Sequence, residues 1–222
     1  MADPLQDSLL REIDEDLRKE KFAKLWKNYG SYIIAAAVLL VVGVAGTQGW
    51  YSYDLGRRQA AGEQLVKAMN VSADDPSVAL GELQSLAENA GSGYALLARL
   101  QEAALLAKGG DQRAAIAIYR ELATGADDPI YRDLAVVLGA QHQLARAGAS
   151  VDRVELERTL QPITVDDNPW RYSAREIMGV LALQAGDNAK AVEIFSALAT
   201  DLRAPQGMRS RAAELQAAAE GG

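Results

Sequence analysis

The chain lacks cysteine, has one histidine, and carries only two phenylalanines and three tryptophans among its 222 residues. The absence of cysteine excludes disulfide bonds and thiolate chemistry. A single histidine leaves no set of ligands typical of a zinc site. Alanine is abundant, and runs of β-branched residues are nearly absent outside one stretch, so the composition predicts an all-α fold.

Basic charge is also scarce. The chain has 23 Lys and Arg against 30 Asp and Glu, and residues 54–222 alone hold 17 against 23. A protein that binds nucleic acid needs a basic surface, so this balance predicts no nucleic-acid partner.

Residues that could carry out chemistry stand apart from one another. His142 falls at a predicted seam between helices, which indicates a packed side chain, with a pH-sensitive role as the alternative. The glycines at 109, 110 and 186 are not followed by Lys-Ser or Lys-Thr, so they predict turns rather than a phosphate-binding loop. We therefore expect no catalytic residue, cofactor, metal or small-molecule substrate, and we predict that the protein is not an enzyme.

Aspartates occur in pairs at three places, each just before a proline or within three residues of one. Negative charge at the start of a helix is favourable there, and an aspartate can cap the helix. None of the pairs has the alternating oxygen ligands around a glycine that a calcium site needs. Capping is predicted for Asp74-Asp75, Asp127-Asp128 and Asp166-Asp167.

Residues 28–53 form an uncharged run that is long enough, at about 1.5 Å per helical residue, to cross roughly 30 Å of hydrocarbon. We predict one transmembrane helix here. Its apolar centre covers residues 33–45, and rings suited to the headgroup zone mark both ends. These rings are Tyr29 and Tyr32 before the centre and Trp50, Tyr51 and Tyr53 after it.

Basic residues crowd the segment before the span far more than the segment after it, from Arg18 to Lys27. Since basic residues are retained on the cytoplasmic side, the N-terminus is predicted to be cytoplasmic and residues 54–222 to lie in the periplasm. Two alternatives are a cleaved signal peptide, with Ala45-Gly46-Thr47 near its cleavage site, and a buried core helix.

Residues 1–27 are predicted to form a cytoplasmic amphipathic tail. Leu5, Leu9, Ile13 and Leu17 recur four apart on one stripe, with an acidic first half and a basic second half. The basic half suits anionic membrane lipid, and a solvated tail that only sets topology is the alternative. Residues 54–93 then read as a helical connector and a first helix pair, broken before Pro76.

Residues 94–222 contain an internal duplication at an offset of 76 residues. Each copy predicts a helix, a Gly-Asp turn, a second helix and a third helix led by proline. Self-similarity at a fixed spacing indicates stacked repeats that share one continuous core. The matched residues are Tyr94/Trp170, Ala98/Ala174, Arg99/Arg175, Leu105/Leu181, Gly110/Gly186, Asp111/Asp187, Ala115/Ala191, Ile118/Ile194, Tyr119/Phe195, Leu122/Leu198 and Pro129/Pro205.

The spacing is about two tetratricopeptide periods, and each copy resembles that family: a small residue where helices meet, a turn glycine, an alanine five residues later and a ring at the seam. The early aromatic and the second tyrosine of the family's first helix are absent. The unit between the copies, residues 131–168, has a degenerate second helix around Leu156 and Leu160. Three repeats and a closing helix at residues 205–220 are expected, which gives the fold class: all-α, with a single N-terminal transmembrane helix followed by a tetratricopeptide-like α-solenoid.

One anchor followed by diverged tetratricopeptide repeats resembles the bacterial family of ancillary SecYEG translocon subunits. The motif from Glu12 to Arg18, leading through Leu25-Trp26-Lys27 into the span, is similar to alphaproteobacterial members. The resemblance implies an inner-membrane tether whose partners are Sec translocon subunits, periplasmic chaperones or emerging chains. An organiser of cell-envelope or division complexes, unrelated to the translocon, is the alternative.

A partner-binding strip is predicted from three arginines early in the first helices of successive units: Arg99, Arg132 and Arg175. Repeat arrays of this type present a concave face to a helix or an extended peptide. Solvated arginines on helix surfaces are the alternative.

Overall fold

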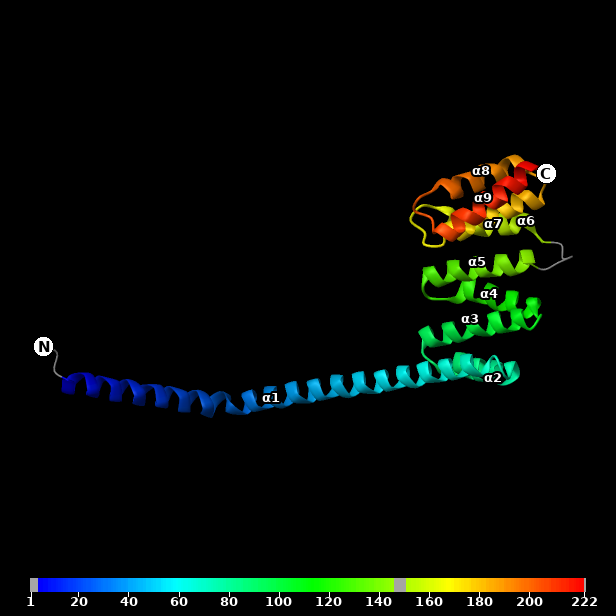
Figure 1. The fold of residues 1–222 in the computed structure, drawn as a ribbon. Coiled ribbons are helices and arrows are strands. Elements are labelled where there is room, and N and C mark those ends of the chain that lie inside the picture. Colours follow the sequence, from blue (N-terminus) through cyan, green and yellow to red (C-terminus); the bar gives the residue numbers. More distant parts are fainter. Residues whose placement is uncertain (1–3, 146–150, 222) are drawn as a thin grey trace. The chain divides into compact units, whose positions relative to one another are not determined.

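The computed structural model describes residues 4–145 and 151–221, and for residues 4–22 it describes the backbone alone. Within these ranges the chain forms nine α-helices, one short 3₁₀-helix and no strand, which confirms the all-α fold class (Figure 1). The chain divides into two units, residues 1–57 and 58–222, and each is described on its own.

The first helix, α1 (Pro4–Val71), is continuous through the segments predicted as tail, span and connector. It ends where Ser72 to Asp75 turn the chain, with the Asp75 amide donating to the carbonyl of Val71 at 2.8 Å. Pro76 cannot continue a helix from the preceding turn, but it suits the first position of the next one.

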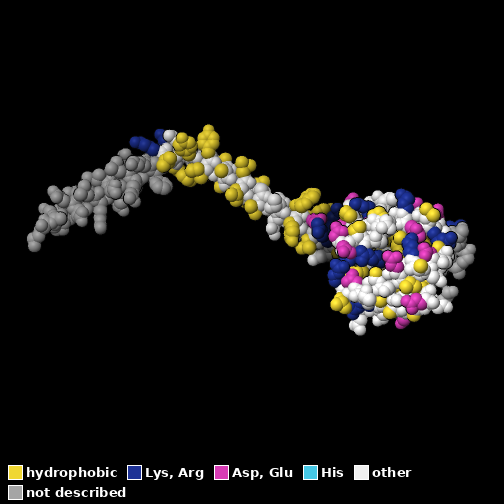
Figure 2. Space-filling model, turned by 90° about the horizontal axis from the view of Figure 1, so that it is seen from above, with side chains coloured by type: hydrophobic (Ala, Val, Ile, Leu, Met, Phe, Trp, Pro, Cys, Tyr) yellow, Lys and Arg dark blue, Asp and Glu magenta, His cyan; other side chains and the backbone are white. Residues whose placement is uncertain are grey.

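The apolar side chains in the middle of α1 lie in the open. Leu39, Leu40 and Trp50 are 73%, 68% and 74% exposed, and Figure 2 shows hydrophobic side chains along this part of the N-terminal unit. In the part of the chain that the structure describes, α1 is the one helix long and apolar enough to cross a membrane. Its exposure distinguishes it from the core helix of a soluble protein, so it suits a membrane span or a signal anchor.

The second unit stacks short helices in chain order, and each helix packs mainly on its neighbours in the sequence (Figure 1). Four clusters of buried side chains follow one another along this stack. The helices are α2 (Pro76–Asn89), α3 (Ser92–Lys108), α4 (Gln112–Gly125), α5 (Pro129–Ala145), α6 (Arg153–Leu160), η1 (Gln161–Thr164), α7 (Arg171–Gln184), α8 (Asn188–Thr200) and α9 (Gln206–Gly221).

The two copies of the duplication fold alike at their turns. Gly110 and Gly186 have φ angles of +93° and +76°, a region that favours glycine because it has no Cβ. The next residue caps the following helix in both copies: the Asp111 carboxylate accepts from the Ala114 amide at 3.0 Å, and Asp187 accepts from Lys190 at 3.1 Å.

The seams between helices also match. Tyr119 and Phe195 are 2% and 0% exposed, and each ring belongs to a cluster built from the helices on either side. Ala115 and Ala191 are fully buried and allow the second helix of each copy to pack closely. The matched residues of the sequence therefore form equivalent parts of two cores.

The middle unit departs from this pattern, as the sequence predicts. Its second helix is reduced to α6 and η1, whose buried residues are Leu156, Leu160 and Ile163. Of the predicted aspartate caps, Asp75 and Asp128 are confirmed: Asp75 accepts from the amides of Ser77 and Val78, and Asp128 from Ile130.

The capping prediction for Asp166-Asp167 is wrong for α7. That helix begins at Arg171, its N-cap Trp170 provides no side-chain cap, and Asp166 instead forms an ion pair with Arg175. The loop after η1 separates the aspartates from the first turn of α7, so a cation later in the helix takes the carboxylate.

Substituting Gly179 by alanine tests the closest seam. A Cβ at Gly179 would lie 2.6 Å from Cε1 and Cζ of the buried Phe195 ring, whereas a Cβ at the exposed helical Gly81 meets nothing within 4 Å. We expect Gly179→Ala to lower the free energy of unfolding by about 1–3 kcal/mol through overpacking. Gly81→Ala, the matched control, is expected to raise it by roughly 0.5–1 kcal/mol. Urea unfolding of the full chain in detergent, followed by far-UV circular dichroism, measures both free energies of unfolding. Equal effects of the two substitutions would contradict the close contact between Gly179 and the Phe195 ring.

Candidate functional site

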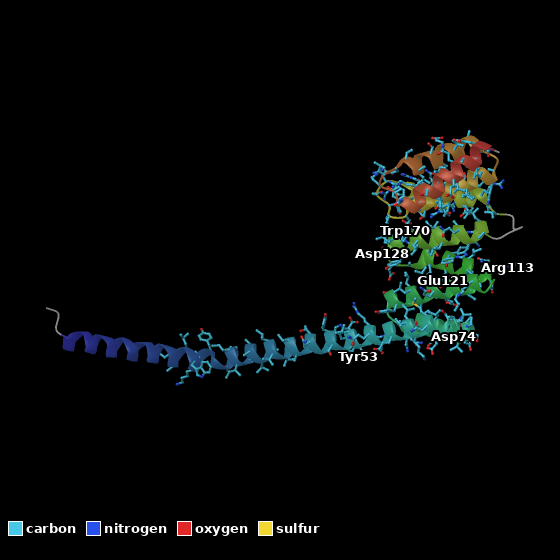
Figure 3. All side chains as sticks on the ribbon, in the orientation of Figure 1. Tyr53, Asp74, Arg113, Glu121, Asp128 and Trp170 are labelled. Atoms are coloured by element: carbon cyan, nitrogen blue, oxygen red, sulfur yellow. The ribbon has the colours of Figure 1, made fainter. Side chains whose placement is uncertain are left out.

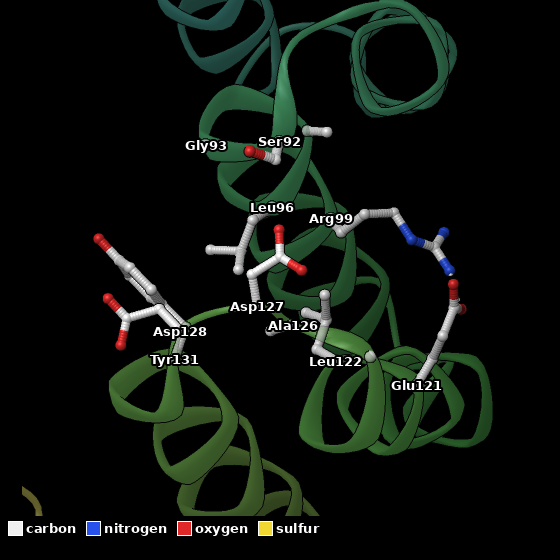
Figure 4. A pocket seen from close by; sticks show the side chains of 12 residues that line it. Ser92, Gly93, Leu96, Arg99, Glu121, Leu122, Ala126, Asp127, Asp128 and Tyr131 are labelled. Carbon is white, nitrogen blue, oxygen red and sulfur yellow. Dashed lines mark hydrogen bonds and ion pairs between the residues drawn. The ribbon is translucent and has the colours of Figure 1, made fainter.

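A pocket lies where α3, the end of α4 and the start of α5 meet (Figure 4). Its volume is about 290 Å³. Most of its surface is apolar, and charged groups also line it. We call this pocket the α3–α5 groove; its lining residues are Ser92, Gly93, Ala95, Leu96, Arg99, Glu121, Leu122, Gly125, Ala126, Asp127, Asp128 and Tyr131.

The Arg99 side chain, predicted to bind a partner, is held by two carboxylates of its own domain. Its Nη1 donates to Oε2 of Glu102 at 2.7 Å, and its Nη2 forms an ion pair with Glu121. The Glu121 pair stands on one side of the groove, across from Asp128 and Tyr131 (Figure 4). Arg99 therefore joins α3 to α4, and its charge is balanced within the chain.

Glu102 is a structural feature beside the groove that the sequence did not reveal. It is 3% exposed and is the one charged residue buried among the described residues. Besides Arg99, it accepts a hydrogen bond from Nε2 of Gln84 on α2 at 2.9 Å. The duplication holds the signal that could have found it, because the residue 76 positions later is Met178, which is apolar and buried.

Arg132, the second predicted binding residue, secures the loop between α4 and α5. Its Nη1 donates to the carbonyl oxygens of Ala126 and Asp127 at 2.7 and 2.9 Å. Both of these residues line the groove. Arg132 thus fixes the loop that lines the groove without lining the groove itself. The exposed Asp127 side chain forms no ion pair with any described residue.

Arg175, the third predicted binding residue, lies apart from the groove on α7. It donates to the carbonyl oxygen of Thr164 through Nε and Nη2, at 2.9 and 2.6 Å, and pairs with Asp166 at 2.7 Å. The structure therefore brings Arg99 and Arg132 to one groove and leaves Arg175 at the connection between η1 and α7. That the three residues bind a partner remains a prediction.

The single histidine packs against the Tyr119 seam. The His142 ring stacks on Tyr119 with centroids 5.4 Å apart, and its Nδ1 lies 3.0 Å from Oε1 of Gln112. The amide oxygen accepts, so Nδ1 carries the proton. Burial lowers the pKa of His142 below its ordinary value of 6.5, because the charged ring would lose hydration.

Within the part of the chain that the structure describes, no three His, Asp or Glu side chains are placed to hold a metal ion. The described carboxylates whose pKa is lowered owe it to hydrogen bonds at helix starts or to neighbouring arginines. In Asp75 the hydrogen bond from Ser77 lowers the pKa, and in Asp166 the Arg175 guanidinium does so. What the geometry offers is a mainly apolar groove with a charged rim, which is suited to binding.

Removing Arg99 tests whether its buried pair is structural. We expect Arg99→Met to lower the free energy of unfolding by about 3 kcal/mol, because it leaves the buried Glu102 carboxylate uncompensated. In Arg99→Met/Glu102→Met most of that loss should be recovered. Arg158→Met breaks an exposed pair at the same i,i+3 separation and is the matched control, with little expected change. Urea unfolding measures all three, and a double variant no more stable than Arg99→Met would contradict the pairing.

His142 predicts a small pH dependence of stability. Since its pKa is lower in the folded chain than in the unfolded chain, the unfolded chain binds the proton first as the pH falls below about 6.5. The contribution of His142 to stability should therefore be constant above that pH, and stability should decline from about pH 6.5 to 5.5, before carboxylates begin to titrate. His142→Gln should remove this decline, because no other histidine is present. Urea midpoints across the interval measure it, and an unchanged slope in the variant would refute the assignment.

Comparison with known proteins identifies one protein family for this chain. No curated protein and no solved structure matches the chain. A family model described as a tetratricopeptide repeat-like domain matches residues 23–217, which covers the latter part of α1 and nearly all of the helical stack. The repeat duplication, the glycine turns and the ring-filled seams described above fit this match. The chain belongs to the tetratricopeptide repeat-like domain family.

Proposed function

We propose that the protein is a non-enzymatic scaffold, held in the bacterial inner membrane by α1, whose periplasmic repeat domain binds protein partners. The observation that carries this proposal is the continuity of α1, in which exposed apolar residues such as Leu40 lead without a break into a repeat domain that carries a groove. Tetratricopeptide-like arrays use such surfaces to bind other proteins.

The proposal assigns four segments. Residues 1–27 form the cytoplasmic tail, in contact with membrane lipid, and residues 28–53 form the span. Residues 54–93 form the connector and first helix pair, and residues 94–222 form the repeats and their closing helix. The basic residues before the span, Lys24 and Lys27 among them, support this orientation.

The proposed partners are Sec translocon subunits beside the span and a periplasmic chaperone or an emerging chain at the repeat domain. This assignment is supported by the resemblance of the whole chain to ancillary translocon subunits. Arg99 and Arg132 contribute to partner binding by holding the walls of the α3–α5 groove. We propose that Arg175 contributes indirectly to partner binding at α7, because it fixes the segment that precedes this helix.

Photocrosslinking in intact membranes tests this function at two positions. A photoreactive residue replaces Leu40, which is 68% exposed in the span, or Ser92, which lines the groove and is exposed. We expect translocon subunits from position 40 and a periplasmic chaperone or emerging chain from position 92. Arg99 is avoided as a probe site, because its replacement would break a buried ion pair.

One control and two alternative outcomes make the result decisive. A probe at the exposed Ser85 of α2, away from the groove lining, should not yield the adducts seen at position 92. Recovery of cell-wall or division proteins from position 92, with lipid alone from position 40, would replace the translocon role by that of an envelope organiser. Adducts with cytoplasmic proteins at position 92 would overturn the proposed orientation.

A further inference from the structure

We propose that the α3–α5 groove recognises an extended protein segment in which an apolar side chain stands next to lysine or arginine. This inference rests on the proposed scaffold function and names the class of partner that the groove accepts. It also reverses the charge expected from the arginine strip, since the groove favours a basic partner and rejects an acidic one.

The size and lining of the groove select an apolar side chain on an extended backbone. Its volume of about 290 Å³ lies just below the roughly 300–1,000 Å³ typical of ligand pockets, which suits one or two side chains better than a whole helix. Leu96, Leu122 and Ala126 provide apolar surface within it. Burying an aliphatic side chain against such surface is worth about 1.5–3 kcal/mol.

The charges around this apolar surface select the residue that stands next to the apolar side chain in the bound segment. Carboxylates of Glu121, Asp127 and Asp128 line the groove, against the single guanidinium of Arg99. Arg99 is already shared between Glu102 and Glu121, so its charge is not available to an acidic ligand. With the buried Glu102 and with Arg132 behind the loop included, four carboxylates face two guanidiniums, and a cation is the complementary ligand.

Tyr131 and the start of α3 complete the match to an extended basic segment. Tyr131 is 37% exposed, and its ring lies on the Asp128 side of the groove (Figure 4), where a lysine or arginine can rest over its face while facing the carboxylate. Gly91, the N-cap of α3, provides no side-chain cap, and Ser92 and Gly93 line the groove. The first amides of α3 can therefore donate to backbone carbonyls of an extended segment.

Asp127 and Gly93 are the positions at which to test this recognition. Asp127 is exposed and unpaired among the described residues, and a Cβ at Gly93 would meet nothing within 4 Å. Asp127→Lys reverses charge at the rim, and Gly93→Leu adds a large apolar side chain to the groove lining without changing its charge. Matched controls exist in the same domain: Asp74→Lys in the exposed turn after α1 (Figure 3) and Gly81→Leu at an open position of α2.

The probes are short fluorescein-labelled peptides in a Gly/Ser background, titrated by fluorescence anisotropy against the full chain in zwitterionic-lipid nanodiscs. One carries Leu-Lys-Leu-Arg, a second replaces the cations by glutamate, and a third replaces the leucines by serine. Empty nanodiscs give the background from lipid binding. We expect the first peptide to bind at least about tenfold more tightly than either of the others, and its affinity to fall with added salt.

Asp127→Lys and Gly93→Leu should each weaken this binding by about fivefold or more, while Asp74→Lys and Gly81→Leu leave it unchanged. Preference for the glutamate peptide, or equal binding to Gly93→Leu and Gly81→Leu, would overturn the inference. Lack of binding by all three peptides would also overturn it. The scaffold function is judged separately by crosslinking at Ser92, so groove adducts without this peptide preference would leave that function standing.

Discussion

The repeat domain depends on close approach between helices where a residue without a bulky side chain faces a ring. A Cβ at Gly179 would collide with Phe195 at 2.6 Å, and a Cβ at Gly139 would lie 3.2 Å from Cβ of Tyr119. These contacts fix how far apart consecutive helices lie, because packed interiors tolerate little change in volume. Tyr119 packs in one cluster with Ala103 of α3 and Ala135 of α5, so the seam also sets the separation of the helices that bound the groove.

Ion pairs inside the domain decide which charges its surface presents. Arg99, Arg132 and Arg175 direct their donors to carboxylates or backbone carbonyls of neighbouring segments. These guanidiniums are therefore engaged within the domain, and residues 54–222 carry an acidic excess overall. Burying Glu102 costs hydration, and the pair with Arg99 together with the Gln84 hydrogen bond offsets it, so α2, α3 and α4 are held in one arrangement.

Local and repeated features of the fold were predictable from the sequence. Gly110 and Gly186 signal their turns, and Asp111 and Asp187 signal their caps, because each effect acts within four residues and occurs twice. The ion pair between Arg99 and Glu121 was not predictable in the same way, since Glu121 lies 22 residues away on another helix. Asp166 was misassigned for the same reason, because nothing local shows that Arg175 reaches back to it.

The duplication separates what builds the domain from what the groove adds. At the offset of 76 residues the positions of the seams and turns carry similar residues, whereas the carboxylates and the ring of the groove are not repeated. Glu121, Asp127, Asp128 and Tyr131 correspond to Ala197, Arg203, Ala204 and Gly207. The second copy therefore keeps the helices and their packing but has neither the carboxylates nor the ring that border the α3–α5 groove.

Arg99 and Arg175 illustrate this divergence at a single matched position. In the first copy the guanidinium meets Glu102 and Glu121; in the second those positions hold Met178 and Ala197, and the guanidinium turns to Thr164 and Asp166 before α7. Arginine at the matched position therefore makes different contacts in the two copies. Asp127 forms no ion pair with a described residue, so its place on the rim is better explained by what the groove is proposed to bind than by what the fold needs.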